Sequence, residues 1–174
     1  MTPSMKRRSS RGAEEFRAHG DSVTARLLFS RAIRWFAAHP KHRSREDAVF
    51  GDGVALFSTG ALESAAVRFG PLARDTLDVN AAGFLGVIAA GRSDRAQARA
   101  IADSIGRVQR RWLLGDNTYW RAAILGTLGE RDAAVELLGT SDRERRRMTR
   151  WHLATELTPL HGFPAFQALI AVRH

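Results

Sequence analysis

The side chains that could do chemistry in this 174-residue chain are six histidines, eighteen carboxylates and 27 basic residues. There is no cysteine, so disulfides, thiolate catalysis and cysteine-ligated metal sites are excluded. The histidines are His19, His39, His42, His152, His161 and His174. No two are four residues apart, and none has a carboxylate beside it in a metal-ligand pattern. The histidines therefore predict loop and capping roles rather than a metal site.

Patterns for nucleotide binding and nucleophilic catalysis are equally weak. No glycine-rich segment ends in Gly-Lys followed by Ser or Thr, and no serine is flanked by glycines. Gly51-Asp52-Gly53 is rich in glycine but lies in helical sequence rather than after a strand. The carboxylates fall at helix starts and on polar faces, where solvated charges are expected. We therefore expect no catalytic activity and no cofactor.

The chain is strongly basic, with a formal net charge of +9 and a pI near 11.4. It contains 25 arginines but only two lysines. Selection for phosphate contact does not exclude lysine, which also binds phosphate well. A GC-rich bacterial genome explains the ratio more simply. The segment 142–147 mixes arginines with Asp142 and Glu144, which favours a solvated helix with ion pairs one turn apart. Nucleic-acid contact by this segment is the alternative.

The elements that must position these side chains are indicated by a turn signature that occurs four times. A small residue is followed by a second turn residue and, four positions later, by alanine: Gly20-Asp21 with Ala25, Gly60-Ala61 with Ala65, Ser93-Asp94 with Ala98, and Gly129-Glu130 with Ala134. The turns are 40, 33 and 36 residues apart. This spacing is typical of repeated helical hairpins of about 34 residues.

Apolar periodicity predicts helices on both sides of each turn and no strand. The expected segments are 12–39 around the first turn, 46–58 with 61–74, 79–90 with 94–108, 117–128 with 131–138, then 142–150 and 164–171. Residues 1–11 are expected to be a disordered basic tail. Gly70-Pro71 predicts a kink or early stop in 61–74. Small residues such as Gly83 and Gly86 predict a close helix–helix approach.

The connector 110–115 between the third and fourth hairpins carries tryptophan and leucine, which we expect to be buried. Trp112, Trp120 and Trp151 each stand alone at a helix junction. We expect them to wedge neighbouring hairpins together rather than to stack on nucleic-acid bases.

Gly20 to Ala25, followed by Phe29 and Ala32, resembles the second half of a tetratricopeptide repeat. The later units keep only parts of that pattern. Residues 79–170 are similar to the C-terminal repeat region that follows kinase, cyclase or transcription-regulator domains in many bacterial proteins. The segments that carry this likeness are 83–90, 117–122 and 157–169. In that family the region is a non-catalytic interaction module.

The resemblance implies an all-α fold in which residues 12–174 form a right-handed α-solenoid of about four degenerate tetratricopeptide-like hairpins with a short C-terminal capping helix. The first helices of the hairpins would line a concave groove. The groove residues implied by the repeat are Asp47, Phe50, Phe57, Asn80, Asp116 and Tyr119. The polar members would hold a peptide backbone, and the two phenylalanines would receive an apolar side chain. Equally, Phe50 and Phe57 are candidates for the core.

We therefore expect a cytoplasmic scaffold that binds a peptide or protein partner, such as an upstream kinase, cyclase or regulator domain. The longest apolar run, 81–90, is too short to span a membrane. Two alternatives stay open: a basic regulatory protein associated with nucleic acid, and an enzyme on a helical scaffold. Phosphate-driven binding should fall steeply with salt, whereas groove binding to a peptide should fall little. An enzyme would need convergent titratable groups, which the sequence does not assemble.

Overall fold

The computed structural model describes residues 12–40, 48–76, 78–110, 112–144 and 151–171. Within these ranges the chain folds into helices joined by turns, and no residue is in a strand. The all-α prediction is therefore confirmed. The predicted basic tail, 1–11, lies outside the described residues. Contacts group the chain into two compact units, Met1–Thr76 and Leu77–His174, and each is described by itself.

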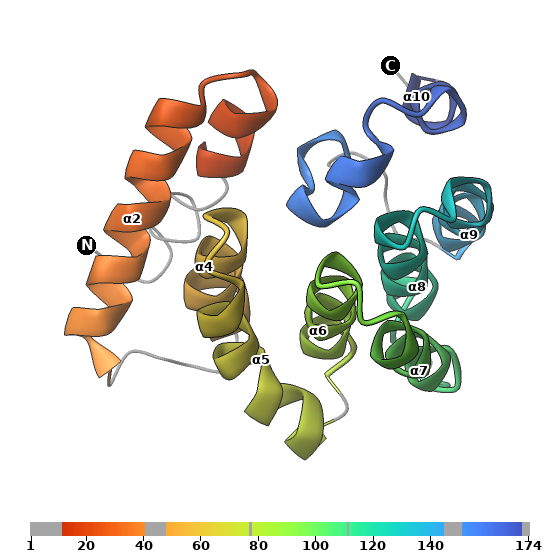
Figure 1. The fold of residues 1–174 in the computed structure, drawn as a ribbon, viewed down its shortest axis with the longest axis horizontal. Helices are drawn as coiled ribbons and strands as arrows, with labels where there is room; N and C mark the ends of the chain where they lie inside the picture. The colour runs from red at the N-terminus through yellow and green to blue at the C-terminus, as the bar shows by residue number, and fades with distance from the viewer. Residues whose placement is uncertain (1–11, 41–47, 77, 111, 145–150, 172–174) are drawn as a thin grey trace. The chain divides into compact units, whose positions relative to one another are not determined.

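The first unit holds a short helical segment at 12–18 and the elements that follow it (Figure 1). They are α2 (Ser22–Ala38), a π-helix, η2 (Ala48–Gly53), α4 (Val54–Ser58) and α5 (Leu62–Thr76). The second unit holds α6 (Val79–Gly91), α7 (Arg95–Gly106), α8 (Asp116–Thr127), α9 (Arg131–Arg143), the 3-10 helices η3 (Trp151–Leu153) and η4 (Thr155–Leu160), and α10 (Pro164–Ala171).

The four predicted turns share one backbone geometry. The second residue after the end of each first helix is left-handed: φ is 87° at Gly20, 82° at Gly60, 64° at Ser93 and 87° at Gly129. At the first turn, the N–H of Asp21 donates to the carbonyl of Phe16 at 2.8 Å, and the N–H of Gly20 donates to Arg17 at 3.1 Å. The other three turns repeat both bonds at matching positions. This pair of bonds is the Schellman arrangement that closes a helix, so the shared signature encodes a shared turn.

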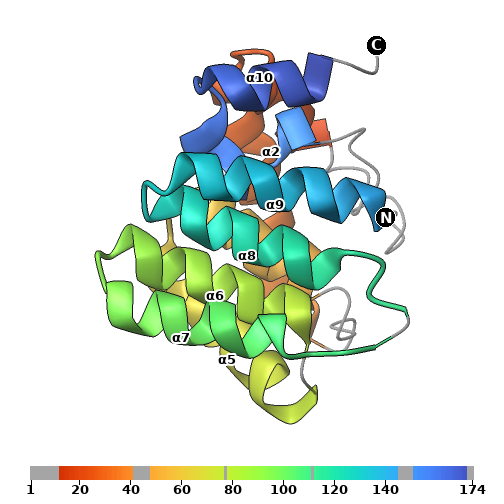
Figure 2. The ribbon, with the colours of Figure 1, turned by 90° about the vertical axis from the view of Figure 1, so that its right-hand side faces the viewer.

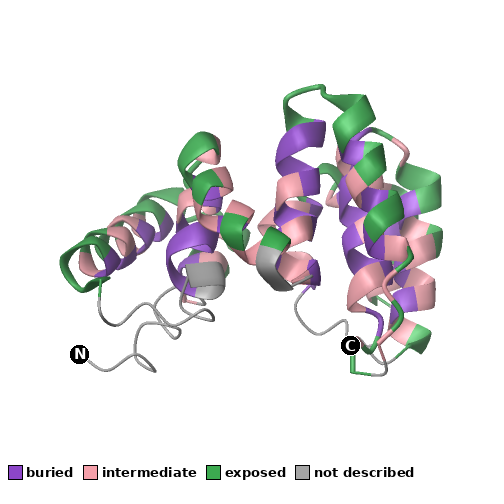
Figure 3. Cartoon of the chain, turned by 90° about the horizontal axis from the view of Figure 1, so that it is seen from below, coloured by how far each residue is buried: buried purple, intermediate pink, exposed green. Residues whose placement is uncertain are grey.

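The alanine of the signature is a core residue in every hairpin. Ala25 is 2% exposed, and Ala65, Ala98 and Ala134 are each 0% exposed. One turn of helix further on, the next position of the same face is also buried, at Phe29, Phe69, Ala102 and Leu138. Figure 3 shows the buried residues as stripes along the helices of each unit. Each second helix thus buries the same face, since residues four positions apart lie on one side of a helix.

The expected N-cap at Asp21 is confirmed. Its carboxylate accepts a hydrogen bond from the backbone N–H of Thr24 at 2.9 Å, and this bond lowers the pKa of Asp21. Asp94 caps α7 in the same way through the N–H of Gln97 at 3.0 Å. Because these bonds satisfy backbone donors that the first turn of a helix leaves free, they fix where α2 and α7 begin.

The second hairpin differs from its prediction in two places. Its first helix is not a plain α-helix, because residues 48–53 form a π-helix that holds Asp52 inside the unit. The Asp52 carboxylate pairs with the guanidinium of Arg68 at 2.7 Å. The early stop expected at Pro71 does not occur, since α5 runs through it to Thr76. Pro71 is exposed, so water can bond the carbonyl that loses its helical donor.

In the second unit, α6 pairs with α7 and α8 pairs with α9, and both α6 and α7 also pack against α8 (Figure 2). The predicted close approach is confirmed. A Cβ atom added at Gly83 would overlap the indole of Trp120, and one at Gly86 would overlap the side chain of Ile124. The seam between α6 and α8 is therefore closed by small residues on one helix and large ones on the other.

The C-terminal elements cover α8 and α9. The predicted helix at 164–171 is confirmed as α10, which packs on α9. The 3-10 helix η4 packs on α8. α9 continues to Arg143, beyond the expected end at 138, and 145–150 of the predicted charged helix lie outside the described residues.

Candidate binding site

The six groove residues implied by the repeat fall into three groups. Asp47 and the side chain of Phe50 lie outside the described residues. Phe57 and Tyr119 are buried, with 8% and 1% of their surfaces exposed. Asn80 and Asp116 are half-buried at the starts of α6 and α8.

Burial corrects the groove assignment of Tyr119 and Phe57. The Tyr119 hydroxyl donates a 2.6 Å hydrogen bond to the Glu156 carboxylate, so its polar group ties α8 to η4. Its ring packs edge-on against Trp120. Phe57 is a core residue, which is the alternative that the sequence left open. Neither side chain presents a surface to a ligand, because both fill the interior of their own unit.

Asn80 and Asp116 occupy matching positions, each thirteen residues before the left-handed residue of its turn. α6 and α8, on which they lie, pack against each other. The Asn80 side-chain oxygen accepts a hydrogen bond from the indole N–H of Trp120 at 2.9 Å, which occupies it structurally. Asp116 lies between two residues that line a pocket, Gly115 and Asn117. Asp116 thus stays a candidate for ligand contact.

The pocket lies beside a feature that the sequence analysis misjudged, the connector between α7 and α8. The expectation that the tryptophans wedge between hairpins holds for Trp120, which is 2% exposed and packs against Phe84 of α6. Trp151 is also buried, with 3% of its surface exposed. The expectation is wrong for Trp112, which is 71% exposed. Leu114, two residues later, is 51% exposed. Two large apolar side chains therefore project from one loop.

The backbone of this connector is strained at its end. Leu114 adopts φ 46° and Gly115 adopts φ 88°. Glycine is required at 115, since an added Cβ would lie 2.7 Å from the carbonyl oxygen of Ser141. The buried Ser141 hydroxyl donates to the Gly115 carbonyl at 2.8 Å and anchors the loop on α9. Leucine is a bulky residue for the left-handed region, where it costs about 1–2 kcal/mol.

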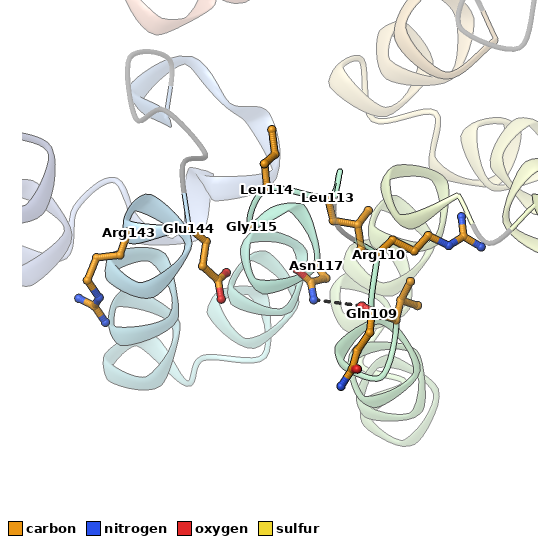
Figure 4. A pocket seen from close by; sticks show the side chains of 9 residues that line it. Gln109, Arg110, Leu113, Leu114, Gly115, Asn117, Arg143 and Glu144 are labelled. Carbon is orange, nitrogen blue, oxygen red and sulfur yellow. Dashed lines mark hydrogen bonds between the residues drawn. The ribbon is translucent and has the colours of Figure 1, made fainter.

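The pocket itself has a volume of about 400 Å³ and opens between the connector and the end of α9 (Figure 4). Its lining residues are Val108, Gln109, Arg110, Leu113, Leu114, Gly115, Asn117, Arg143 and Glu144. The Asn117 amide donates a long, 3.4 Å hydrogen bond to the Val108 carbonyl. The Glu144 carboxylate accepts the Thr118 hydroxyl at 2.7 Å. Arg110 and Arg143 extend away from the pocket on opposite sides.

This lining suits recognition. Val108, Leu113 and Leu114 offer aliphatic surface, and Gln109 and Asn117 offer amide groups. The Arg110 guanidinium lies 5.9 Å from the centre of the Trp112 ring, within range of a cation–π contact. Apolar surface with a few polar groups is typical of ligand sites.

Two other kinds of site are absent from the part of the chain that the structure describes. The described residues contain no group of three or more histidines and carboxylates that could hold a metal ion. Among them, no helix is long and apolar enough to cross a bilayer.

One signal in the sequence could have found the site. The run 110–115 places a tryptophan and two leucines in a connector that follows two arginines and ends in glycine. The expected burial of this run rests on composition alone, and composition does not show which apolar loop residues have a neighbour to pack against.

No protein-family model, curated protein or solved structure is significantly similar to this chain.

Proposed function

We propose that this chain is a non-catalytic protein-interaction module built as a right-handed solenoid of degenerate, tetratricopeptide-like hairpins. Four turns with the same hydrogen bonds and the same buried alanine support a repeated hairpin unit. In the second unit, α8 packs against both helices of the preceding hairpin, as neighbours do when hairpins stack.

The observation that carries the binding role is the exposed pair Trp112 and Leu114 in the connector, of which Leu114 lines the pocket. Moving an apolar side chain out of water is favourable by about 25 cal/mol per Å² of apolar surface that is buried. Tryptophan is also the residue type most enriched among the energetically dominant contacts of protein interfaces. A partner that covers this loop would bury both side chains together.

Quantitative crosslinking in a lysate of the native host tests this proposal. We expect the full chain to crosslink to a defined protein, and we expect Trp112→Ala to lose that product. Val67→Ala removes a side chain that is 69% exposed in the first unit, and should leave the product unchanged. If no protein is crosslinked above background, the interaction role is wrong.

A second function is favoured by one observation, the arginine beside an exposed indole. Trp112 with Arg110 is the kind of platform on which nucleic-acid bases stack, and the chain as a whole is basic. Binding through phosphates should fall steeply between about 50 and 200 mM salt. If the crosslinked proteins are lost when the lysate is treated with nuclease, they are held through nucleic acid, and this function is favoured over the first.

A further inference from the structure

We infer that the pocket beside Trp112 recognises a peptide segment in which one apolar side chain is flanked on both sides by carboxylates. This inference rests on the proposed interaction role and names the chemistry of the partner. It is carried by three features of one place in the fold: exposed apolar groups, amides, and arginines on opposite sides.

Leu114 shows that the apolar surface is kept for use. Glycine or asparagine at this position would adopt φ 46° with less strain. Leucine accepts that strain while leaving about half of its surface, 51%, in water. Residues in sparsely populated backbone conformations concentrate at ligand-binding positions, and the exposed group here is apolar, which favours an apolar ligand.

The floor of the pocket sets the size of that apolar group. Val108 and Leu113 line it, and Gly115 leaves its centre without a side chain. A volume of about 400 Å³ admits one large side chain and the backbone around it, but not a folded domain. Trp112 lies in the same connector, between the pocket-lining residues Arg110 and Leu113, and 71% of its surface is exposed.

The amide side chains at the pocket favour an occupant with an extended backbone. The Asn117 amide holds the Val108 carbonyl only at 3.4 Å, near the limit of a hydrogen bond. Gln109 is exposed at the same edge. Both side chains offer donors and acceptors that match the N–H and carbonyl groups of a peptide.

The charges make the partner acidic at its two ends. Arg110 and Arg143 extend away from the pocket on opposite sides (Figure 4). Arg143 also donates to the Thr140 hydroxyl at 2.9 Å, and its remaining N–H groups, like those of Arg110, can pair with a carboxylate on either side of the apolar residue. Arginine binds carboxylates with two parallel hydrogen bonds. The Glu144 carboxylate between them already accepts the Thr118 hydroxyl.

A nucleic acid fits this charge pattern less well. Its phosphates repeat at every nucleotide, so one of them would approach Glu144 or Asp116 at the pocket. A peptide can place its carboxylates only where the arginines are. The observations therefore favour a peptide, and single-stranded DNA becomes the competing probe in the test.

Selection of peptides from a random library displayed on phage, with the full chain as bait, tests the inference. We expect the enriched peptides to share an aromatic or aliphatic residue flanked by Asp or Glu. We then expect Trp112→Ala to weaken the best peptide by at least about tenfold. The double variant Arg110→Gln/Arg143→Gln should weaken it similarly, and more strongly at low salt.

Matched variants keep this test specific. Arg31→Gln/Arg34→Gln removes the same charge from exposed positions of α2 and should change the affinity by less than about twofold. Val67→Ala plays the same part for Trp112→Ala. Unchanged far-ultraviolet circular dichroism shows that each variant is folded.

Each result decides a different point. Peptides that bind wild type and Trp112→Ala equally overturn the inference but leave the interaction role standing. A consensus without acidic residues, or no enrichment, overturns the inference, while the crosslinking experiment separately decides the interaction role. If an oligothymidine displaces the peptide and itself needs Trp112, the pocket binds nucleic acid and the inference is wrong.

Discussion

Trp112 and Trp120 are eight residues apart and could hardly be placed more differently. Trp120 lies in α8 with 2% of its surface exposed, packed against Phe84 at a ring distance of 4.5 Å and bonded to Asn80. Trp112 lies in the connector before α8 with 71% exposed. One tryptophan closes the seam between α6 and α8, and the other has no such seam to fill.

The difference shows which large side chains of this molecule contribute to folding and which do not. In the seam every choice agrees: small residues on α6 face large ones on α8, and the indole N–H has an acceptor. In the connector two choices conflict with the fold, the exposure of Trp112 and the left-handed Leu114. Conflicts of this kind concentrate at functional positions. Stability and binding should therefore separate between the two regions.

The sharpest break in the comparison is Trp120→Ala. We expect a loss of about 3–5 kcal/mol in the free energy of unfolding, because a buried indole leaves a cavity and the Asn80 oxygen loses its donor. Urea denaturation followed by circular dichroism measures it. A loss below about 1 kcal/mol would mean that α6 and α8 are not held together at this seam.

Gly83→Ala should have the next largest effect. The added methyl group would overlap the Trp120 ring, and overpacking of this kind costs about 1–3 kcal/mol. Gly91→Ala is the matched control, since an added Cβ on the last residue of α6 meets open space. It should be neutral or stabilising by up to about 1 kcal/mol. Equal effects of the two changes on the urea midpoint would contradict the close approach.

The seam and the turns could be predicted from the sequence because local rules decide them. Glycine and serine at the left-handed positions, the alanines of the second helices and the N-cap at Asp21 each follow from short-range geometry. Gly83 and Gly86 signalled the close packing because a helix keeps such residues only for a reason.

The site could not be predicted in the same way. Tyr119 was placed in a groove by its position in the repeat, but its burial depends on Glu156, 37 residues away. Trp112 stands at a helix junction, which predicts a wedge between hairpins, but 71% of its surface is exposed. The π-helix at 48–53 was missed because its Asp52–Arg68 pair joins two helices. Each miss depends on which elements meet in space, which spacing alone does not give.

Leu114→Asn tests the claim that leucine is not there for stability. Asparagine tolerates the left-handed conformation, so relief of about 1–2 kcal/mol of strain should offset the lost burial of a half-exposed leucine. We expect the free energy of unfolding to stay level or rise by up to about 1 kcal/mol. Peptide affinity should fall in the same variant. A marked loss of stability would make Leu114 a structural residue and blur the comparison with Trp120.

Ser93→Gly tests the same kind of left-handed strain at a turn to which no binding role is assigned. Ser93 holds φ 64° where the other three turns have glycine. Glycine removes the left-handed strain but adds freedom to the unfolded chain, so we expect a net gain of about 0.5 kcal/mol. Calorimetry should show a small rise in the melting temperature. Gly129→Ser, the reverse change at the equivalent turn, should lower it by a similar amount.

Trp112→Ala should give the smallest change in stability, within about 0.5 kcal/mol, because its indole is largely in water and makes no buried hydrogen bond in the described part of the chain. The Arg110 guanidinium lies 5.9 Å from the centre of the ring, at the outer limit of a cation–π contact, so losing this contact costs little stability. The same substitution is expected to weaken peptide binding by at least about tenfold. A residue that leaves the urea midpoint unmoved while controlling affinity is used for recognition. If Trp112→Ala instead destabilises the chain as Trp120→Ala does, the indole packs in solution and the contrast between seam and connector disappears.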